Sequence, residues 1–184
     1  MNNMTKTLEK QDIPSFHLLI VAGGIGTRFG GNTPKQFLKI NNKTILDYSL
    51  SRFLTFSELK SIVIVVANDY LSLLPDCVKK NSKVKIIQSG KDRKQSVYNG
   101  LNGFFKVNNN DIVLVHDAAR PLVSKQDIST LLIKMGETQA STLATRIKDT
   151  LLKDNKTVDR NDMWAIETPQ AFKYLILKQA HEQY

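Results

Sequence analysis

Short apolar runs alternate with longer amphipathic segments along most of the chain. Four runs that are apolar or rich in β-branched residues predict buried strands at 16–22, 61–68, 83–90 and 111–121. In the segments between them apolar residues recur at helical spacing, as do Leu46, Leu50 and Phe53, which would share one helix face. The sequence therefore predicts helices over 43–56, 69–81 (started or interrupted by Pro75), 94–105, 125–137 and 168–184 (entered through Pro169).

The order of these elements predicts the fold class. Strand and helix alternate, which is the pattern of an α/β, doubly wound, mostly parallel Rossmann-like sheet. Residues 1–15 are polar and predict a flexible tail, so one domain would span 16–184, with a strand or hairpin arm over 140–154. Because ligands of such sheets bind beyond the carboxyl ends of the strands, the segments after Val21, Ile87 and Val115 are the candidate site.

Composition narrows the class of protein. Apolar residues make up 41% of the 184 residues and charged residues 23%, an ordinary balance for a globular chain. No apolar stretch approaches the roughly 20 residues of a membrane helix, and residues 1–15 hold no signal-peptide core. The lone Cys77 cannot form an internal disulfide. We therefore expect a cytoplasmic protein without membrane contact.

The net charge of +9 is unusual, and seven of the 26 basic residues lie between Lys79 and Lys94. A solvated basic face is the favoured interpretation. Attraction of small anionic substrates and phosphate-mediated nucleic-acid binding are the two alternatives. No zinc-finger spacing or aromatic-rich RNA-binding signature supports nucleic acid, so no such partner is expected.

The segment "VAGGIGTRFGGNTPKQF" (21–37) carries the strongest chemical signal, with five glycines directly after the first predicted strand. Glycines let backbone N–H groups approach a phosphate or base closely. The segment is not a Walker A motif, since Lys-Ser/Thr does not follow Gly31, and Phe29 breaks the dinucleotide fingerprint. Arg28 and Lys35 could reach a triphosphate from different sides, the first as a bidentate fork and the second as a mobile point charge.

This segment resembles the G-x-G-x-R-x(n)-P-K-Q loop of sugar-phosphate nucleotidyltransferases. Three further segments, "SGKDRKQSVYNGL" (89–101), "VLVHDAARPLV" (113–123) and "VDRNDMWAIETPQAF" (158–172), resemble the 2-C-methyl-D-erythritol 4-phosphate cytidylyltransferase family in order and spacing. The resemblance implies transfer of a cytidylyl group from CTP to that sugar-alcohol phosphate, with release of pyrophosphate, in non-mevalonate isoprenoid biosynthesis. Such chemistry needs positioning and charge stabilisation from the protein.

The resemblance also assigns roles to single residues. Arg28 and Lys35 would be the catalytic pair that stabilises the transition state and the leaving pyrophosphate. CTP would be held by Ala22, Gly23, Gly24, Gly90 and Ser96, although Ser96 could instead cap a helix. The sugar-alcohol phosphate would be held by Asp117, Arg120, Thr150, Arg160 and Thr168.

Asp117 and three residues near the predicted site need separate comment. Asp117 would help to hold Mg²⁺, bound largely by phosphate oxygens, or would form a structural ion pair with Arg120. His116 fits a packed scaffold residue better than a base, and Arg93 would brace the loop after the third strand. Lys91 stands where the family commonly has an acidic or small residue, so we assign it no ribose contact.

The family's segment corresponding to 140–162 is an arm that embraces a second subunit, which implies a homodimer. Thr150 and Arg160 would then serve the neighbour's site, and Trp164 would anchor the arm or the core. The family's T-D-(D/E)-A-S and N-I-K-(V/I)-T segments have no counterpart here, so we expect a C-terminally truncated chain. Some members are also fused to a following cyclodiphosphate synthase.

Two other functions stay open. Ribitol-5-phosphate cytidylyltransferases share the glycine loop but tend to carry a valine in the first motif and no tryptophan in the second. This chain has "HDAARP" (116–121) and "DRNDMW" (159–164), which favour the methylerythritol phosphate enzyme. A module that binds CTP without turnover would also fit the loop.

Overall fold

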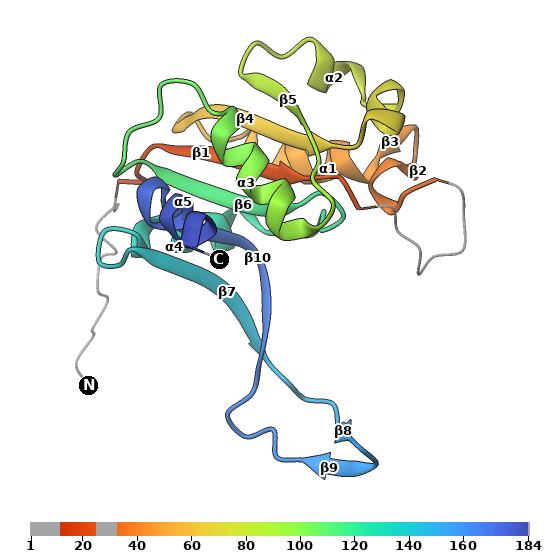
Figure 1. The fold of residues 1–184 in the computed structure, drawn as a ribbon, viewed down its shortest axis with the longest axis vertical. Helices are drawn as coiled ribbons and strands as arrows, with labels where there is room; N and C mark the ends of the chain where they lie inside the picture. The colour runs from red at the N-terminus through yellow and green to blue at the C-terminus, as the bar shows by residue number, and fades with distance from the viewer. Residues whose placement is uncertain (1–11, 25–32, 184) are drawn as a thin grey trace, which may run out of the picture.

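A six-stranded sheet forms the centre of the protein (Figure 1). The computed structural model describes residues 12–24 and 33–183. The sheet order is β5 (Val84–Gln88), β4 (Leu59–Val66), β1 (Phe16–Val21), β6 (Ile112–Asp117), β10 (Trp164–Lys173) and β7 (Ala140–Arg146). The first four strands are parallel, whereas β10 is antiparallel to both of its neighbours. The predicted mostly parallel α/β sheet is confirmed.

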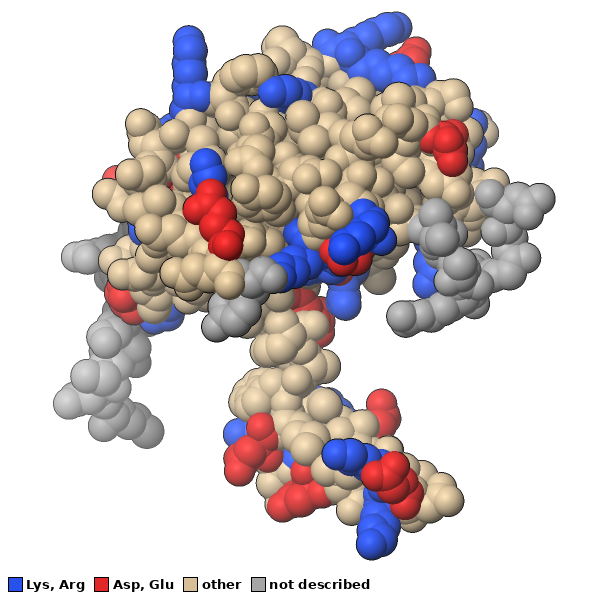
Figure 2. Space-filling view, in the orientation of Figure 1, with Lys and Arg blue, Asp and Glu red and all other residues tan. Residues whose placement is uncertain are grey.

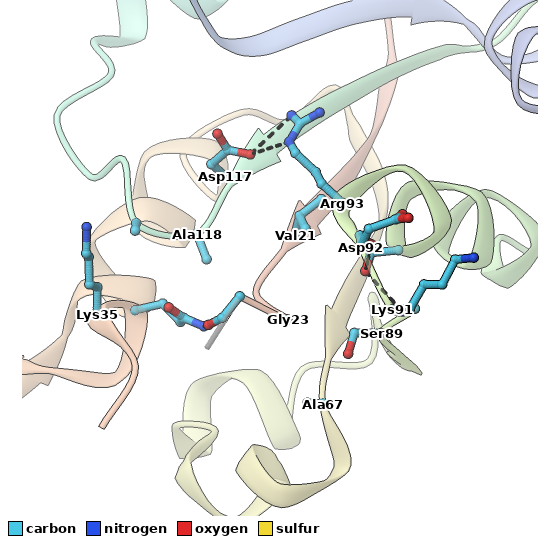
Figure 3. Close-up of a pocket in the computed structure, with 15 residues that line it drawn as sticks. Val21, Gly23, Lys35, Ala67, Ser89, Lys91, Asp92, Arg93, Asp117 and Ala118 are labelled. Carbon is cyan, nitrogen blue, oxygen red and sulfur yellow. Dashed lines mark hydrogen bonds and ion pairs between the residues drawn. The ribbon is translucent and has the colours of Figure 1, made fainter. Parts of the chain in front are cut away.

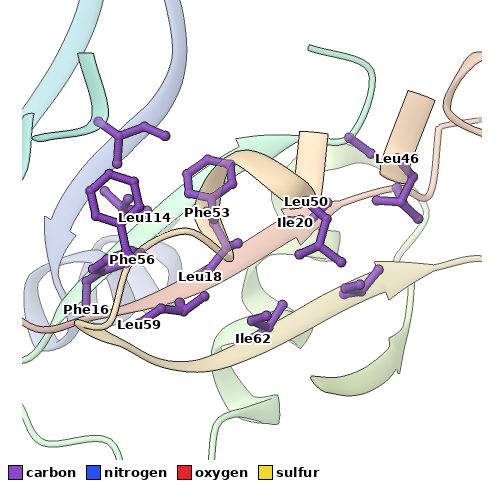
Figure 4. Close-up of a cluster of buried hydrophobic side chains, with 14 of the residues drawn as sticks. Phe16, Leu18, Ile20, Leu46, Leu50, Phe53, Phe56, Leu59, Ile62 and Leu114 are labelled. Carbon is purple, nitrogen blue, oxygen red and sulfur yellow. The ribbon is translucent and has the colours of Figure 1, made fainter. Parts of the chain in front are cut away.

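Helices cover both faces of the sheet, which explains why its central strands are apolar throughout. Alternate residues of β1 point to opposite faces. Leu18 and Ile20 pack against α1 (Ile45–Phe53) and α4 (Lys125–Lys134), and Figure 4 shows part of this cluster. Leu19 packs on the other face with α3 (Arg93–Gly103) and α5 (Tyr174–Gln183). Ile13, inside the predicted tail, packs against the first cluster.

Short elements occupy the segments after β1 and β4. The 3₁₀ turn η2 (Lys35–Phe37) leads into a small hairpin of β2 (Lys39–Ile40) and β3 (Lys43–Thr44). The helix predicted over 69–81 is interrupted at Pro75, giving the 3₁₀ helix η3 (Asn68–Leu73) and the short α2 (Asp76–Lys79). Proline has no N–H to continue the helical ladder, so it ends one piece and begins the next.

Two predicted boundaries were wrong. The last helix begins at Tyr174 rather than near Pro169, because residues 164–173 form β10. Residues 170–173 pair with β6 on one side, and 170–172 pair with β7 on the other, so sheet pairing outweighs the helix-start signal of Pro169. The fourth strand ends at Asp117, four residues before Pro121, and the segment 118–121 is a turn with a hydrogen bond from Arg120 N–H to Asp117 O.

β7 and β10 continue beyond the sheet into a protruding arm (Figure 1). The segment predicted as one strand or hairpin arm contains β7 and a separate β8 (Leu151–Lys153), which pairs with β9 (Lys156–Val158) at the tip. Asp154 and Asn155 join them with positive φ angles of 51° and 59°, as a two-residue hairpin turn requires. Trp164 is 48% exposed and its ring lies 4.9 Å from the Arg146 guanidinium, so it belongs to the arm and not to the core.

None of the described helices is long and apolar enough to cross a membrane. The basic residues between 79 and 94 divide into two groups. In Figure 2 basic side chains gather over α2 and β5 at the top of the view, where Lys79 and Lys80 lie exposed. Lys91 and Arg93 instead line the cavity described below.

Candidate active site

A cavity of about 680 Å³ opens at the carboxyl ends of the parallel strands (Figure 3). Its wall is made by the segment after β1, by η2, by residues 89–93 together with Ser96, and by residues 117–119 at the end of β6. The three strand ends predicted from the sequence therefore meet around one space. Ala67, which follows β4, completes the wall.

The segment after β1 approaches the end of β5 so closely that it needs a glycine. A Cβ on Gly23 would collide with the Ser89 Cβ, whereas one on Gly24 would meet none of the residues that the structure describes. Both glycines line the cavity, as expected of CTP contacts. Ala22 differs, because it is buried and its N–H donates to the Val65 carbonyl at 2.7 Å. Ala22 thus supports the wall, and its N–H is already used by the sheet.

Ser96 holds the loop after β5 in place. Its Oγ accepts from the Gly90 N–H at 3.0 Å and donates to the Asp92 carbonyl at 2.7 Å. The N-cap of α3 is Asp92, whose carboxylate accepts from the Gln95 N–H at 2.7 Å, so the alternative that Ser96 caps this helix is wrong. Since its proton goes to Asp92, the Ser96 hydroxyl can only accept from a ligand.

The structure describes only one of the two residues expected to be catalytic. Arg28 lies outside the described residues. Lys35 is the first residue of η2 and lines the cavity. Figure 3 shows Lys35 at one side of the cavity, with Lys91, Asp92 and Arg93 at the other. The preceding Pro34, with φ of −60° and ψ of 144°, sets the direction in which the chain enters this turn.

Asp117 lies between two guanidinium groups. Its Oδ1 accepts from Arg93 Nε and pairs with Arg93 Nη2, both at 3.1 Å, and its Oδ2 is 3.5 Å from Arg120 Nε. These side chains are 32% to 50% exposed, so each pair contributes modestly to stability. Arg120 lies beside the cavity rather than in its wall, with Nη1 3.9 Å from Glu167 Oε2.

His116 and Thr168 form a buried support beneath Asp117. His116 Nε2 lies 3.0 Å from the Arg120 carbonyl, which can only accept, so Nε2 carries the proton and Nδ1 accepts from the Thr168 hydroxyl at 3.1 Å. Thr168 Oγ1 in turn accepts from the Asp117 N–H at 3.2 Å. Burial lowers the pKa of His116 to about 4, which keeps the ring neutral. The prediction of a scaffold histidine is confirmed.

Thr150 and Arg160 are not brought to this cavity. Both are exposed on the arm, Thr150 just before β8 and Arg160 just after β9. Thr168 is also absent from the cavity wall, because it lies under Asp117. Of the five residues assigned to the sugar-alcohol phosphate, only Asp117 lines the cavity of its own chain.

Two residues were missed by reasoning from sequence. Gln36 is buried, and its Nε2 donates to the carbonyls of Ala22 and Gly24 at 2.6 and 2.9 Å. Its place beside Lys35 in the "PKQ" segment was the available signal. Glu167 accepts from the Thr145 hydroxyl at 2.6 Å and faces Arg120. Nothing in the sequence marks Glu167, since both partners are distant along the chain.

The side chains around Asp117 suit a metal ion held mainly by phosphate oxygens better than one held mainly by the protein. Both oxygens of Asp117 already face guanidinium groups. Among the described residues, no three His, Cys, Asp or Glu side chains come together as a metal site would require. Of the two carboxylates in the cavity wall, Asp92 caps α3 and Asp117 stands at the strand end, so the protein could add at most a ligand or two to a cation held mainly by phosphate oxygens and water.

Comparison with known proteins adds independent evidence. The model of the IspD family, described as 2-C-methyl-D-erythritol 4-phosphate cytidylyltransferase, matches residues 16–184. Curated proteins of that name from Thermotoga neapolitana and Pseudoalteromonas translucida are 38% and 39% identical to 90% and 97% of this chain, which covers 76% and 73% of theirs. The crystal structure of the Francisella tularensis protein of that name has a TM-score of 0.78 at 33% identity, over 92% of this chain and 77% of that one. The bifunctional IspDF of Campylobacter jejuni has a TM-score of 0.79 at 30% identity, over 92% of this chain and 44% of its own.

Proposed function

The chain belongs to the 2-C-methyl-D-erythritol 4-phosphate cytidylyltransferase family, and on that premise we propose the reaction that its cavity carries out. A phosphate oxygen of 2-C-methyl-D-erythritol 4-phosphate attacks the α-phosphorus of CTP. The bond from that phosphorus to the oxygen bridging the α- and β-phosphates breaks, and pyrophosphate leaves. The product is a cytidine diphosphate ester of the sugar alcohol, a precursor in non-mevalonate isoprenoid biosynthesis.

The observation that carries this proposal is the convergence of two kinds of group on one cavity. At Gly23 and Gly90 a Cβ would collide with a neighbouring side chain, so glycine lets the backbone pack closely in this part of the cavity wall, where we place the pyrimidine. Cationic side chains, Lys35 on one side and Lys91 and Arg93 on the other, provide the charge that a triphosphate needs. Transfer of a phosphoryl-type group depends mainly on such positioning and charge.

Individual residues take the following parts in our proposal. Lys35, together with Arg28 from the undescribed segment, stabilises charge that develops on the α-phosphoryl oxygens and the leaving pyrophosphate. Gly23, Gly24, Gly90 and Ser96 hold the cytidine, with the Ser96 hydroxyl accepting from the nucleotide. Asp117 accepts hydrogen bonds from the hydroxyl groups of the sugar alcohol and so orients the attacking phosphate. Neutral His116 keeps the backbone of Asp117 and Arg120 in place without exchanging a proton.

We propose Mg²⁺ as the cofactor. When bound, it offsets the negative charge of the triphosphate. Phosphate oxygens would supply most of its ligands, and Asp117 is the carboxylate of this cavity wall best placed to add one at the strand end. We also propose a cytoplasmic location.

We further propose that two chains form a homodimer through the arm. Thr150 and Arg160 are exposed on the arm and do not reach the cavity of their own chain. An arm that reaches the second subunit would bring them to its sugar-alcohol phosphate, where the Arg160 guanidinium can grip the phosphate in bidentate fashion.

The reaction is tested by pyrophosphate release from CTP, Mg²⁺ and 2-C-methyl-D-erythritol 4-phosphate. Lys35→Ala should lower kcat about a hundredfold or more, because it removes one contact to the transition-state charge. Lys39→Ala, an exposed neighbour on β2, is the matched control and should stay within twofold. Equal or faster turnover of ribitol 5-phosphate would identify the alternative substrate. CTP binding without any pyrophosphate release would identify a non-catalytic module.

The dimer is tested by complementation. Lys35→Ala and Arg160→Ala chains are each expected to be inactive, but a mixed dimer pairs one intact Lys35 cavity with an arm that keeps Arg160. Mixing the two variants should therefore restore up to about a quarter of wild-type activity, the share of such cavities under random pairing. No recovery, in a mixture shown by sedimentation to exchange subunits, contradicts the shared site.

A further inference from the structure

Gln36 is the buried polar side chain of the cavity wall to which the reaction above gives no part. It is 5% exposed and stands in η2, next to Lys35. Its Nε2 donates to Ala22 O at 2.6 Å and to Gly24 O at 2.9 Å. Both hydrogens of one side-chain amide are thereby used on the two carbonyl groups that flank Gly23.

These contacts fix the direction of a backbone donor. A trans peptide is planar, with its C=O and N–H pointing to opposite sides. Because the Ala22 carbonyl points toward Gln36, the Gly23 N–H of the same peptide points away from it. None of the described residues accepts a hydrogen bond from that N–H. Gly23 lines the cavity, so this N–H is available to a molecule bound there.

We propose that Gln36 is a positioning residue that orients the Gly23 peptide for nucleotide binding. The identity of the nucleotide, CTP, rests on the function proposed above. The same three-residue turn carries Lys35, so one element sets both the backbone donor and a cation of the cavity. Gln36 acts through the peptide and does not need to touch the reacting atoms.

An amide is the side chain that suits this position. The two partners are carbonyl oxygens, so the group between them must donate twice, as the NH₂ of Gln does. A carboxylate of the same shape would set acceptors against acceptors. An aliphatic side chain would remove this donor from the buried carbonyl of Ala22, which is costly in a protein interior, and from the partly buried carbonyl of Gly24.

The test compares Gln36→Glu with wild type by calorimetry of CTP and by steady-state kinetics. At about pH 8 the variant should bind CTP roughly 10- to 100-fold more weakly, with KM for CTP raised and KM for the sugar-alcohol phosphate within twofold. Gln126→Glu adds the same charge at an exposed position on α4 and is the matched control, expected to change neither constant beyond twofold.

The pH dependence of CTP affinity in Gln36→Glu distinguishes a positioning role from a merely structural one. Burial between two carbonyls raises the pKa of a carboxyl at position 36, and the neutral acid can donate one hydrogen bond. The ratio of variant to wild-type CTP affinity should therefore recover several-fold between about pH 8 and pH 5.5. A ratio that stays constant with pH, or a variant that loses thermal stability but binds CTP like wild type, overturns the proposal.

A measurement without nucleotide separates this inference from the proposed function. In wild type the ¹⁵N order parameter of the Gly23 amide should be near 0.85, and in Gln36→Glu at about pH 8 it should fall below about 0.6. If wild type fails to bind CTP, the proposed function fails, and the order parameter still decides the role of Gln36. An unchanged order parameter contradicts that role.

Discussion

The strand ends around the cavity and the arm that leaves the same sheet are built in opposite ways. β1 and β6 are buried along nearly their whole length, and Gln36, Ser96 and His116 at the cavity each make two hydrogen bonds. On the arm, Leu152 is 68% and Ile166 53% exposed. The described cavity wall is therefore held in place by hydrogen bonds and packing within one chain, whereas the arm leaves apolar side chains exposed.

The largest expected difference between the cavity region and the arm is a loss of stability on acidification, which comes from the cavity region. Burial holds the pKa of His116 at about 4, against 6.5 for an exposed histidine. The unfolded chain therefore takes up a proton first as the pH falls, so stability is present above about pH 6.5 and is lost down to about pH 4. The loss amounts to roughly 3 kcal/mol. Urea unfolding followed by circular dichroism at a series of pH values measures it.

The control for this prediction is His116→Gln, which should remove most of that pH dependence. Burial also lowers the pKa of His17, so a smaller slope of the same sign should remain in the variant. All three histidines of the chain lie outside the arm, at 17, 116 and 181, so no histidine of the arm contributes to this slope. Identical slopes for variant and wild type would show that His116 is not the group responsible.

A pair of glycine substitutions gives the next largest effect. Gly23→Ala forces a Cβ against Ser89 and should lower the free energy of unfolding by about 1–3 kcal/mol, with weaker CTP binding. Gly24→Ala, one residue on, places its Cβ within 4 Å of none of the described residues and should cost well under about 1 kcal/mol of stability. Leu152→Ser on the arm should stay within about 0.5 kcal/mol. Thermal and urea unfolding measure these changes. Equal losses of stability in Gly23→Ala and Leu152→Ser would contradict the expected difference between the cavity and the arm.

The smallest effect is expected at Glu167, where the two regions join. Glu167 accepts from Thr145 of β7 at 2.6 Å and lies 3.9 Å from the Arg120 guanidinium. Because both side chains of the ion pair are 40% exposed or more, Glu167→Gln should cost less than about 1 kcal/mol of stability. A double-mutant cycle with Arg120→Ala measures the coupling energy between Glu167 and Arg120. A coupling energy of zero would mean that this ion pair does not link β10 to the segment beside the cavity.

The parts of the fold that the sequence predicts are those whose signal is local. Runs such as 16–22 and 61–68 are apolar because both faces of their strands are covered, and this shows in the residues themselves. β10 was missed as a strand because Pro169 resembles a helix start, while the pairing that decides the outcome comes from β6 and β7, which are distant along the chain.

The same distinction between local and long-range signals applies to the candidate site. Gly23, Gly90 and Lys35 were found because glycines and cations in a loop after a strand carry their chemistry in the sequence. Gln36 was missed because its partners are backbone carbonyls, which have no letter in a sequence. The position of Thr168 beneath Asp117, rather than in the cavity, depends on hydrogen bonds between β10 and β6 that no spacing rule predicts.

The placement of Trp164 has a practical consequence. It is the one tryptophan in the chain, and it sits half exposed on the arm against Arg146. Selective excitation of its indole therefore yields an intrinsic fluorescence signal that originates in the arm alone. Emission colour and accessibility to a dissolved quencher would report the arm's surroundings in an unlabelled sample, at any stage of titration with substrates or with a second chain.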